Sequence, residues 1–556
     1  MTTIERERFW PAYLPADLHF MKGERPLFEY LTEHSKDEPD RPAIVFYNRV
    51  ITYKEWDDMS NSVAQFLVAA GVKKQDRVAL FMPTFPGFLI AYMGISKMGG
   101  IAVTCSTAFK EDELEYQLQD SGAEVIFCLD HYMGTFKRVF EKLHLKKVIL
   151  TGYRDFFDSS QADNVPDEIR KSRSCHEGTV ELLDIFRNYP STALNVPIDL
   201  HSDIALIMYT GGTTGLPKGA ILSHFGVIYK TACRVQINYH GLYKDGEKSR
   251  NVILTLPIYH IAGLLLSHTV LYQRLTQVMI PRFEPLALMK AIQEYKPEVL
   301  FTVTQMNLSM MNHPDIRNYN LRSIKRNYIA SLGVALTEDI ATQWHDHVGE
   351  DCIVVDSGYG LTETNTANCF VPLDRPPKWG SAGISVYGEK IKIVSLQDRN
   401  QVMPVGESGE IAVRTPSHFL GYWNKPKETT ETLVDGWVFT GDVGKLDEEG
   451  YLYVQGRNKE MIKTNGLSVF PEEVELLLRK HPAIAECGVR GIPDAKKGEV
   501  IKAVVVLNEG FKEKVSAEEI INWAKDKMSF YKVPKVLEIR DALPIGVAGK
   551  KLRRLL

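Results

Sequence analysis

Short apolar runs alternate with helical patterns between residues 77 and 303 of the chain. Short apolar runs predict buried strands, and longer segments whose apolar positions recur with a helical period predict helices. The predicted strands are RVALFM (77–82), IAVTC (101–105), AEVIFC (123–128) and PEVLFTV (297–303), and the predicted helices are an amphipathic run at 87–97, ELEYQLQD (113–120) and PLALMKAIQEY (285–295). This alternation is typical of doubly wound α/β units built on a parallel sheet.

The sequence pattern changes beyond residue 380, where turns rich in Gly, Asp and Asn separate shorter predicted strands. These strands are EKIKIVS (389–395), GEIAVRT (409–415) and GYLYVQG (450–456), and they favour an antiparallel region. The last hundred residues predict a compact α+β unit, with a helix opened by Pro471, a strand at 501–507 and a helix at 517–528. The predicted fold class is therefore α/β, with a large N-terminal body of doubly wound α/β subdomains, a small β-rich region and a small C-terminal α+β domain.

Residues 151–200 interrupt the alternation of predicted strands and helices with polar stretches that contain turn-forming residues, such as DSSQADNVPDE and SRSCHEG. We predict a surface excursion here. A plain linker is the alternative that the same composition allows.

Composition and charge narrow the class of protein. Of the 556 residues, 44% are apolar and 24% charged, which is ordinary globular usage. Because 66 basic residues nearly balance 70 acidic ones, for a net charge of −4, neither nucleic acid nor an anionic membrane is an expected partner. The seven cysteines contain no C-x-x-C pair, so neither a zinc site nor a redox motif is indicated. The sequence shows neither a long apolar run nor a signal peptide, so we expect a cytoplasmic location.

The most informative segment is YTGGTTGLPKG (209–219), which follows the apolar run DIALIMY (203–209). Small residues let backbone N–H groups approach an oxyanion, while the threonines add hydroxyl donors and Lys218 adds a positive charge. The Walker pattern fails because Leu216 and Pro217 separate Gly215 from the lysine. A phosphate-binding loop is predicted, and a tight glycine turn is the structural alternative.

This loop resembles the phosphate-loop signature of the adenylate-forming superfamily, which includes acyl-CoA synthetases, peptide-synthetase adenylation domains and firefly luciferase. Five further motifs resemble those of the family and occur in its order. They are LPIYHIAG (256–263), DSGYGLTET (356–364), TGD (440–442), GRNKEMIKTNG (456–466) and PIGVAGKKLRRLL (544–556). The resemblance covers nearly the whole chain and is strongest to acyl-CoA ligases.

The resemblance implies roles for individual residues. His260 would line the acyl site, Tyr359 would face adenine, Asp442 and Arg457 would contact the ribose, and Gly466 would border a thiol tunnel. The implied catalytic residues are Lys550, His260, Thr210 and Glu363, of which Thr210 and Glu363 would also hold Mg²⁺. The implied set for ATP and CoA is Thr210, Gly211, Gly212, Thr213, Thr214, Gly215, Lys218, Gly333, Val334, Ala335, Asp356, Gly358, Tyr359, Gly360, Leu361, Thr362, Asp442, Arg457, Lys459, Lys463, Gly466 and Lys550.

Family membership would also imply the reaction and the domains. A carboxylic acid, first of all a medium- or long-chain fatty acid, would attack ATP to give acyl-AMP and pyrophosphate, and CoA would then take the acyl group. Residues 1–456 would form the adenylate-forming domain and residues 457–556 a mobile C-terminal domain that turns about a hinge near Lys459. An aryl or cyclic acid, a carrier-protein acceptor, an oxygenase like luciferase and a homo-oligomeric assembly stay open as alternatives.

Some positions depart from the family pattern, and some motif residues have structural interpretations of their own. SLGVAL (331–336) replaces the usual SGGAPL, so Leu332 would narrow the acyl or adenine pocket. Gln305 places a polar side chain near the acyl site. Asp442 alone could be a turn residue, and Arg553 with Arg554 is interpreted as a solvated terminal helix face.

Overall fold

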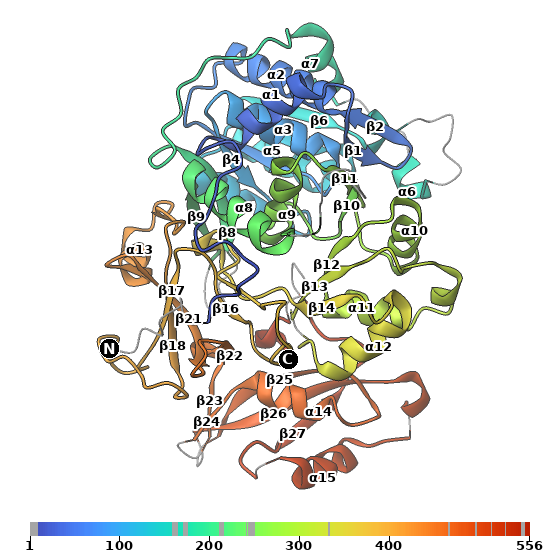
Figure 1. The fold of residues 1–556 in the computed structure, drawn as a ribbon, viewed down its shortest axis with the longest axis vertical. Helices are drawn as coiled ribbons and strands as arrows, with labels where there is room; N and C mark the ends of the chain where they lie inside the picture. The colour runs from blue at the N-terminus through green and yellow to red at the C-terminus, as the bar shows by residue number, and fades with distance from the viewer. Residues whose placement is uncertain are drawn as a thin grey trace.

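The computed structural model describes residues 9–157, 165–170, 176–210, 216–240, 242, 251–331, 334–464, 467–494, 498–512, 514–528, 530–545 and 551–556. The largest sheet formed by these residues has eight strands and makes up much of the body (Figure 1). Its strand order is β19 (Gly421–Tyr422), β9 (Lys218–Ser223), β8 (Ile204–Thr210), β4 (Ile101–Thr104), β3 (Arg77–Phe81), β5 (Val125–Leu129), β6 (Lys147–Thr151) and β7 (Val180–Glu181). The strands from β8 to β7 pair in parallel, whereas β9 and β19 pair antiparallel. The predicted doubly wound sheet is confirmed.

Two smaller sheets complete the body. One contains β10 (Asn251–Leu254), β11 (Thr276–Met279), β1 (Pro42–Phe46) and β2 (Arg49–Thr52), and the other contains β12 (Val299–Val303), β13 (Arg326–Ala330) and β14 (Ile353–Asp356). Their strands pair in parallel except for β1 with β2, which pair antiparallel. The hydroxyl of Thr255, which follows β10, donates to the carbonyl of Phe301 in β12 and joins the two sheets. The carboxyl ends of β10 and β12 therefore lie close together.

Helices cover these sheets and bury their apolar faces. In the body they are α1 (Leu27–Asp37), α2 (Tyr53–Ala69), α3 (Pro86–Lys97), α4 (Glu111–Ser121), α5 (Met133–Leu143), α6 (Asp167–Arg170), α7 (Leu182–Asn188), α8 (His224–Asn238), α9 (Ile261–Tyr272), α10 (Pro285–Tyr295), α11 (Thr304–Met311), α12 (Glu338–Val348) and α13 (Pro426–Thr432). The predicted helices at 113–120 and 285–295 are confirmed as α4 and α10.

Helix α3 corrects one prediction. The segment 87–97 was expected to be amphipathic, yet every residue of α3 is buried. Helix α2 covers the side of α3 that would otherwise face water, and the Lys97 ammonium donates to Asp57 (2.6 Å) and Asn61 (2.7 Å) of α2. A helix enclosed on all sides needs no polar stripe.

The segment 151–200 is also more than a surface excursion. Its aromatic residues Phe156 and Phe157 are buried in the main core together with Leu182 and Ile185 of α7. Strand β7 pairs with β6 and extends the eight-stranded sheet at its edge. The expectation of a simple excursion or linker is therefore wrong for the described residues of this segment.

The β-rich region beyond residue 380 is antiparallel, as predicted. Its main sheet contains β17 (Lys390–Val394), β18 (Gly409–Arg414), β21 (Trp437–Leu446), β20 (Leu433–Val434) and β22 (Leu452–Arg457), and a small pair is formed by β15 (Cys369–Phe370) and β16 (Ile384–Ser385). In Figure 1 this region lies beside the sheet of β12, β13 and β14, below the eight-stranded sheet and above the C-terminal unit.

The C-terminal unit has its own sheet and its own core. The sheet contains β24 (Leu467–Val469), β23 (Ile462–Thr464), β26 (Gly498–Leu507), β25 (Ile484–Asp494) and β27 (Val536–Ile539), and it carries α14 (Pro471–Leu478) and α15 (Ala517–Lys527). The core runs from Ile462 to Val533 and draws its buried residues from this unit. The predicted α+β character is confirmed.

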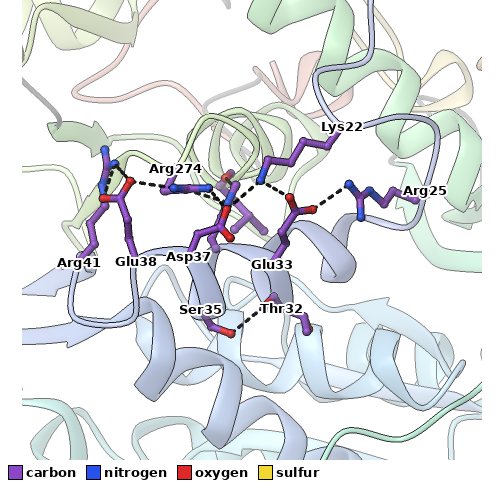
Figure 2. Close-up of polar contacts among 11 residues, drawn as sticks. Lys22, Arg25, Thr32, Glu33, Ser35, Asp37, Glu38, Arg41 and Arg274 are labelled. Carbon is purple, nitrogen blue, oxygen red and sulfur yellow. Dashed lines mark hydrogen bonds and ion pairs between the residues drawn. The ribbon is translucent and has the colours of Figure 1, made fainter. Parts of the chain in front are cut away.

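A polar network at the end of α1 ties the N-terminal segment to the end of α9. Figure 2 shows Arg274 reaching Asp37 (2.6 Å) and Glu38 (2.7 Å), while Lys22 bridges Asp37 and Glu33. Arg274 also donates from Nε to Nδ1 of His34 (3.0 Å), so the buried imidazole is neutral and its Nε2 donates to the Leu271 carbonyl (3.0 Å).

Among the described residues, no helix combines the length and the apolar character that a bilayer crossing demands.

We predict that stability falls as the pH drops through the range set by His34. Burial, reinforced by the Arg274 charge, lowers the pKa of His34 from 6.5 to about 4. The unfolded chain therefore binds a proton between these values and the folded chain does not, so the imidazole favours unfolding increasingly below pH 6.5. At about 1.4 kcal/mol per pKa unit the loss reaches roughly 3 kcal/mol by pH 4.

Urea unfolding of the native chain and of His34→Gln across this pH range measures the effect. The difference in unfolding free energy between the two proteins should change with pH in the stated direction. An unchanged difference would contradict the assignment.

Candidate functional site

The motif segments lie at the carboxyl ends of strands from two sheets, the eight-stranded sheet and the sheet of β12, β13 and β14. Thr210 ends β8, Val303 ends β12, Ala330 ends β13 and Asp356 ends β14. In open parallel α/β sheets, ligands bind beyond the carboxyl ends of the strands. The sequence motifs are thus placed where this architecture forms its binding sites.

The predicted phosphate loop connects β8 and β9. Thr210 and Lys218 are direct partners in the antiparallel pair, and the Thr210 hydroxyl lies 3.4 Å from the Lys218 carbonyl. The central residues of the loop lie outside the described residues, namely Gly211, Gly212, Thr213, Thr214 and Gly215. The hairpin brings the hydroxyl of Thr210 and the backbone of Lys218 to one end of the sheet.

A tyrosine that the sequence analysis missed connects this hairpin with Glu363. The Lys218 ammonium lies 4.3 Å from the centre of the Tyr422 ring, within cation–π range. The Tyr422 hydroxyl donates to Glu363 (2.6 Å), and burial together with the Glu363 charge raises the pKa of this tyrosine. Tyr422 lies in the short sequence GYW (421–423), which carried no signal of its own.

The segment Asp356–Asn368, which contains the predicted nucleotide-binding motif and is called the nucleotide loop below, lies next to these residues. Asp356 accepts hydrogen bonds from the Ser331 hydroxyl and from the Gly358 N–H (2.8 Å), and burial raises its pKa to about 6. Gly360 passes close to the backbone of Ala367, where an added Cβ would lie 2.1 Å from an amide nitrogen. Only a residue without a side chain fits that crossing.

Three predicted ribose and adenine residues meet in space. The Tyr359 hydroxyl donates to Asp442 (2.6 Å), and Nε of Arg457 lies 2.9 Å from the other carboxylate oxygen of Asp442. Asp442 and Arg457 face each other in the pairing of β21 with β22. Burial and the Asp442 charge raise the pKa of Tyr359, so the ring stays a neutral phenol beside the ion pair.

The second half of the nucleotide loop reverses the chain. Thr362 begins a short 3₁₀ turn (Thr362–Thr364), and the next three residues, Asn365, Thr366 and Ala367, all have positive φ values of 50–59°. Leu361 ends the extended part that precedes the turn. The backbone carbonyl of Glu363 accepts from the N–H of Phe419 (2.8 Å), which holds the turn against the segment that leads to Tyr422.

The predicted acyl-site residues lie on separate segments. His260 immediately precedes α9, and its loop is held by Thr104, which donates to the Tyr259 carbonyl (3.1 Å). Gln305 is the second residue of α11. Val334 and Ala335 follow β13 in an irregular segment, whereas Leu332 and Gly333 lie outside the described residues, so the predicted narrowing stays a prediction.

The predicted hinge lies between the last strand of the β-rich region and the C-terminal sheet. β22 ends at Arg457, Lys459 lies in the 3₁₀ turn Asn458–Glu460, and the backbone of Lys463 belongs to β23. Gly466 and Lys550 lie outside the described residues. The structure therefore brings the ribose residues together but does not address the lysine at the chain end.

The expectation of a solvated terminal face is wrong for Arg553, whereas Arg554 is exposed as expected. The Arg553 guanidinium pairs with Glu460 in the predicted hinge, with Glu472 (2.7 Å) and with Glu475 (3.1 Å), and its side chain is only 16% exposed. Lys551 also pairs with Glu475. The segment 551–556 is therefore fixed to α14 and to the turn at Glu460.

The donor chemistry fits the predicted magnesium ion. In the part of the chain that the structure describes, no three His, Cys, Asp or Glu side chains gather as a metal cluster. Glu363 offers a single carboxylate near the hairpin that carries Thr210. Mg²⁺ is commonly held by one or two carboxylates, water and substrate phosphates, so this small donor set suits it better than a metal that needs a full protein cage.

Comparisons with known proteins agree with these motifs. Residues 31–423 match the sequence model of the family described as AMP-binding enzyme, and residues 473–550 match that of the AMP-binding enzyme C-terminal domain.

Three relatives illustrate the range of the similarity. The chain is 31% identical to a long-chain-fatty-acid–CoA ligase of Bacillus subtilis, over 100% of this chain and 98% of the relative. It is 30% identical to a feruloyl-CoA synthase of an Amycolatopsis species, over 93% and 95%. The structure is similar to ATP-bound MatB of Rhodopseudomonas palustris, with a TM-score of 0.81 and 26% identity over 95% and 97% of the two chains.

We predict that Gly358→Ala destabilises the protein far more than Gly441→Ala. Both glycines have positive φ (96° and 71°), but a Cβ at Gly358 would lie 2.0 Å from the Cys369 carbonyl oxygen, whereas no atom lies within 4 Å of the position at Gly441. The conformation alone costs roughly 1–2 kcal/mol for an L-residue. The clash should add several kcal/mol at Gly358, and urea unfolding of both variants measures the difference. Equal losses of unfolding free energy in the two variants would contradict the prediction, because the backbone of the nucleotide loop would then have moved to make room for the Cβ.

Proposed function

The chain belongs to the AMP-binding enzyme family, and from that premise we propose that it is an ATP-dependent acid–CoA ligase. It activates a carboxylic acid as acyl-AMP with release of pyrophosphate and then transfers the acyl group to CoA. The observation that carries the proposal is the meeting of Tyr359, Asp442 and Arg457 beside the chain of contacts from Lys218 through Tyr422 to Glu363.

In the first step a carboxylate oxygen of the acid bonds to the α-phosphorus of ATP, and the bond from that phosphorus to the bridging oxygen of pyrophosphate breaks. Catalysis of such a step is mainly positioning and electrostatic stabilisation. Asp442 accepts the ribose hydroxyls, Arg457 holds the Asp442 carboxylate in place, and the ring of Tyr359 lies against the adenine. Lys218, the threonines of the phosphate loop and Lys550 supply positive charge and donors to the phosphates.

Glu363 and the Thr210 hydroxyl would hold Mg²⁺, which supplies positive charge to the phosphate oxygens when it is bound. The hydrogen bond from Tyr422 fixes the orientation of the Glu363 carboxylate. The backbone contact from Phe419 to Glu363 fixes the turn on which that side chain stands.

In the second step the thiol sulfur of CoA bonds to the acyl carbon and its proton is released to solvent. The bond from that carbon to the bridging phosphate oxygen breaks, and AMP leaves with the electrons of that bond. We propose that residues 457–556 turn about Lys459 between the steps, withdrawing Lys550 and bringing the segment of Lys463 and Gly466 to the acyl-AMP. The separate core of the C-terminal unit and its connection through a three-residue turn support this division, because a few residues can absorb such a motion.

The acid is proposed to be a medium- or long-chain fatty acid, with His260 lining its site. The similarity to long-chain-fatty-acid–CoA ligases over the full chain supports this class. An aryl acid is the second candidate, favoured by the similarity to a feruloyl-CoA synthase.

A pyrophosphate-release screen across straight-chain, aromatic and amino acids, each with and without CoA, tests the proposal. We expect sustained release only with CoA present, and the highest rates with straight-chain acids of medium or long length. Equal turnover without CoA would favour a carrier-protein acceptor or an oxygenase, and a preference for aromatic acids would select the second candidate.

We predict that Lys550→Ala and Lys459→Pro separate the two steps. Removing the Lys550 ammonium should lower acyl-AMP formation by roughly 10²–10³-fold, the usual cost of a lost charge-stabilising donor, while thioester formation from supplied acyl-AMP stays within a few-fold. Lys459→Pro should leave ATP–pyrophosphate exchange close to normal and block thioester formation, because proline fixes φ at the proposed pivot. Equal loss of both steps in either variant would refute its assignment.

A further inference from the structure

Helix α8 carries two buried cations that face the nucleotide loop. Lys230 is completely buried and Arg234 is 5% exposed, and they lie four residues apart on one face of the helix. Gly226, four residues earlier on the same face, passes so close to the loop that a Cβ there would lie 2.5 Å from the side-chain nitrogen of Asn365. This face of α8 therefore follows the nucleotide loop over two helical turns.

The two cations hold opposite ends of the loop through backbone carbonyls. Arg234 donates to the carbonyl of Ser357 (3.2 Å), at the start of the loop, and Lys230 donates to the carbonyl of Ala367 (3.0 Å), near its end. Ala367 is the last of the three consecutive residues with positive φ. An L-residue is strained in this conformation, so the turn persists only where its surroundings hold it.

Glu389 neutralises Lys230 and extends the network to the rest of the loop. Its carboxylate pairs with Lys230 and accepts from Thr415 (2.8 Å) and from the amide of Asn368 (2.8 Å). The oxygen of the Asn368 amide in turn accepts from the Thr364 hydroxyl (2.7 Å), next to Glu363. The contacts thus run without interruption from α8 to the residue beside the proposed magnesium ligand.

Helix α8 is also attached to the phosphate hairpin, which consists of β8, β9 and the predicted phosphate loop between them. Ser223 ends β9 and caps α8, accepting from the N–H of Gly226 (3.1 Å), and β9 begins at Lys218. A rigid helix therefore links the strand that carries Lys218 to both ends of the loop that carries Glu363.

We propose that Lys230 and Arg234 are positioning residues that fix the nucleotide loop relative to the phosphate hairpin, and so set Thr362 and Glu363 at the distance that Mg·ATP requires. The inference rests on the proposed function. A buried ion pair is a weak source of stability because desolvation offsets its attraction, so the contacts to loop carbonyls explain the pair better than stability does.

The test compares Lys230→Met, the double variant Lys230→Met/Glu389→Gln, and Lys97→Met as a matched control. Lys97 is also a buried lysine paired with a carboxylate, Asp57, but it joins α3 to α2 and touches no residue of the nucleotide loop in the described contacts. The double variant removes both buried charges while leaving an amide that can still bond Thr415 and Asn368. It therefore separates the cost of an unpaired charge from the loss of the hold on Ala367.

Two measurements are made on each full-length protein. The first is the rise in melting temperature that ATP produces as Mg²⁺ is titrated, which reports binding without turnover. The second is ATP–pyrophosphate exchange, with kcat and the KM values for acid and for ATP determined separately.

Lys230→Met and the double variant should both need roughly 5–10-fold more Mg²⁺ for half of the ATP-induced shift, and should lose about 10²-fold in kcat with the KM for the acid unchanged, as expected for a misplaced catalytic group. The double variant should recover most of the melting temperature that Lys230→Met loses. Should the single variant fail to fold, the double variant carries the test, because it buries no unpaired charge. Lys97→Met should lower the melting temperature and leave the Mg²⁺ dependence as in the native chain.

Recovery of both stability and Mg²⁺ dependence in the double variant would overturn the inference, since the effect would then be charge burial alone. A Mg²⁺ shift of the same size in Lys97→Met would also overturn it. Failure of the native chain to bind ATP or to exchange pyrophosphate with any acid would instead refute the proposed function, so the two failures are distinguishable.

Discussion

The structure depends on satisfying the backbone of one irregular segment that crosses the body. Between Asp356 and Asn368 the chain forms neither a strand nor an α-helix, yet no residue in it is exposed, and Thr364, Asn365 and Ala367 are buried. Buried N–H and C=O groups need partners, and here β13, α8 and the segment before β19 supply them. The surrounding sheets and helices supply these hydrogen bonds and so fix the backbone of the segment. The fixed backbone in turn sets the positions of the side chains that meet there.

Much of the architecture could be predicted from the sequence because its signals are local. Pro285 marks the first residue of α10, and the apolar run at 77–82 becomes β3. Burial was harder to predict, because the enclosure of α3 depends on α2, which lies some distance away in the sequence. The aromatic residues of 151–200 were likewise hidden among polar neighbours, although they enter the main core.

In the candidate site, too, some residues could be predicted from local motifs and others could not. Motifs located Tyr359, Asp442 and Arg457, and the structure brings all three into contact. Tyr422 lies 59 residues from its partner Glu363, and Glu389 lies 159 residues from Lys230, so no spacing rule links them. Single-sequence patterns report neighbours along the chain. These pairs are made by the fold, and each looks ordinary in its own local sequence.

The glycine crossings of the nucleotide loop also bear on how proteins of this architecture diversify. Gly358 and Gly360 each pass within contact distance of another backbone segment, leaving no room for even a methyl group. No other residue fits at these positions without a clash, so the loop cannot gain side chains there that would recognise a new ligand. On the proposed function, side chains that select the acid would have to come from other segments, such as those of His260 and Gln305, because these two backbone crossings admit no side chain.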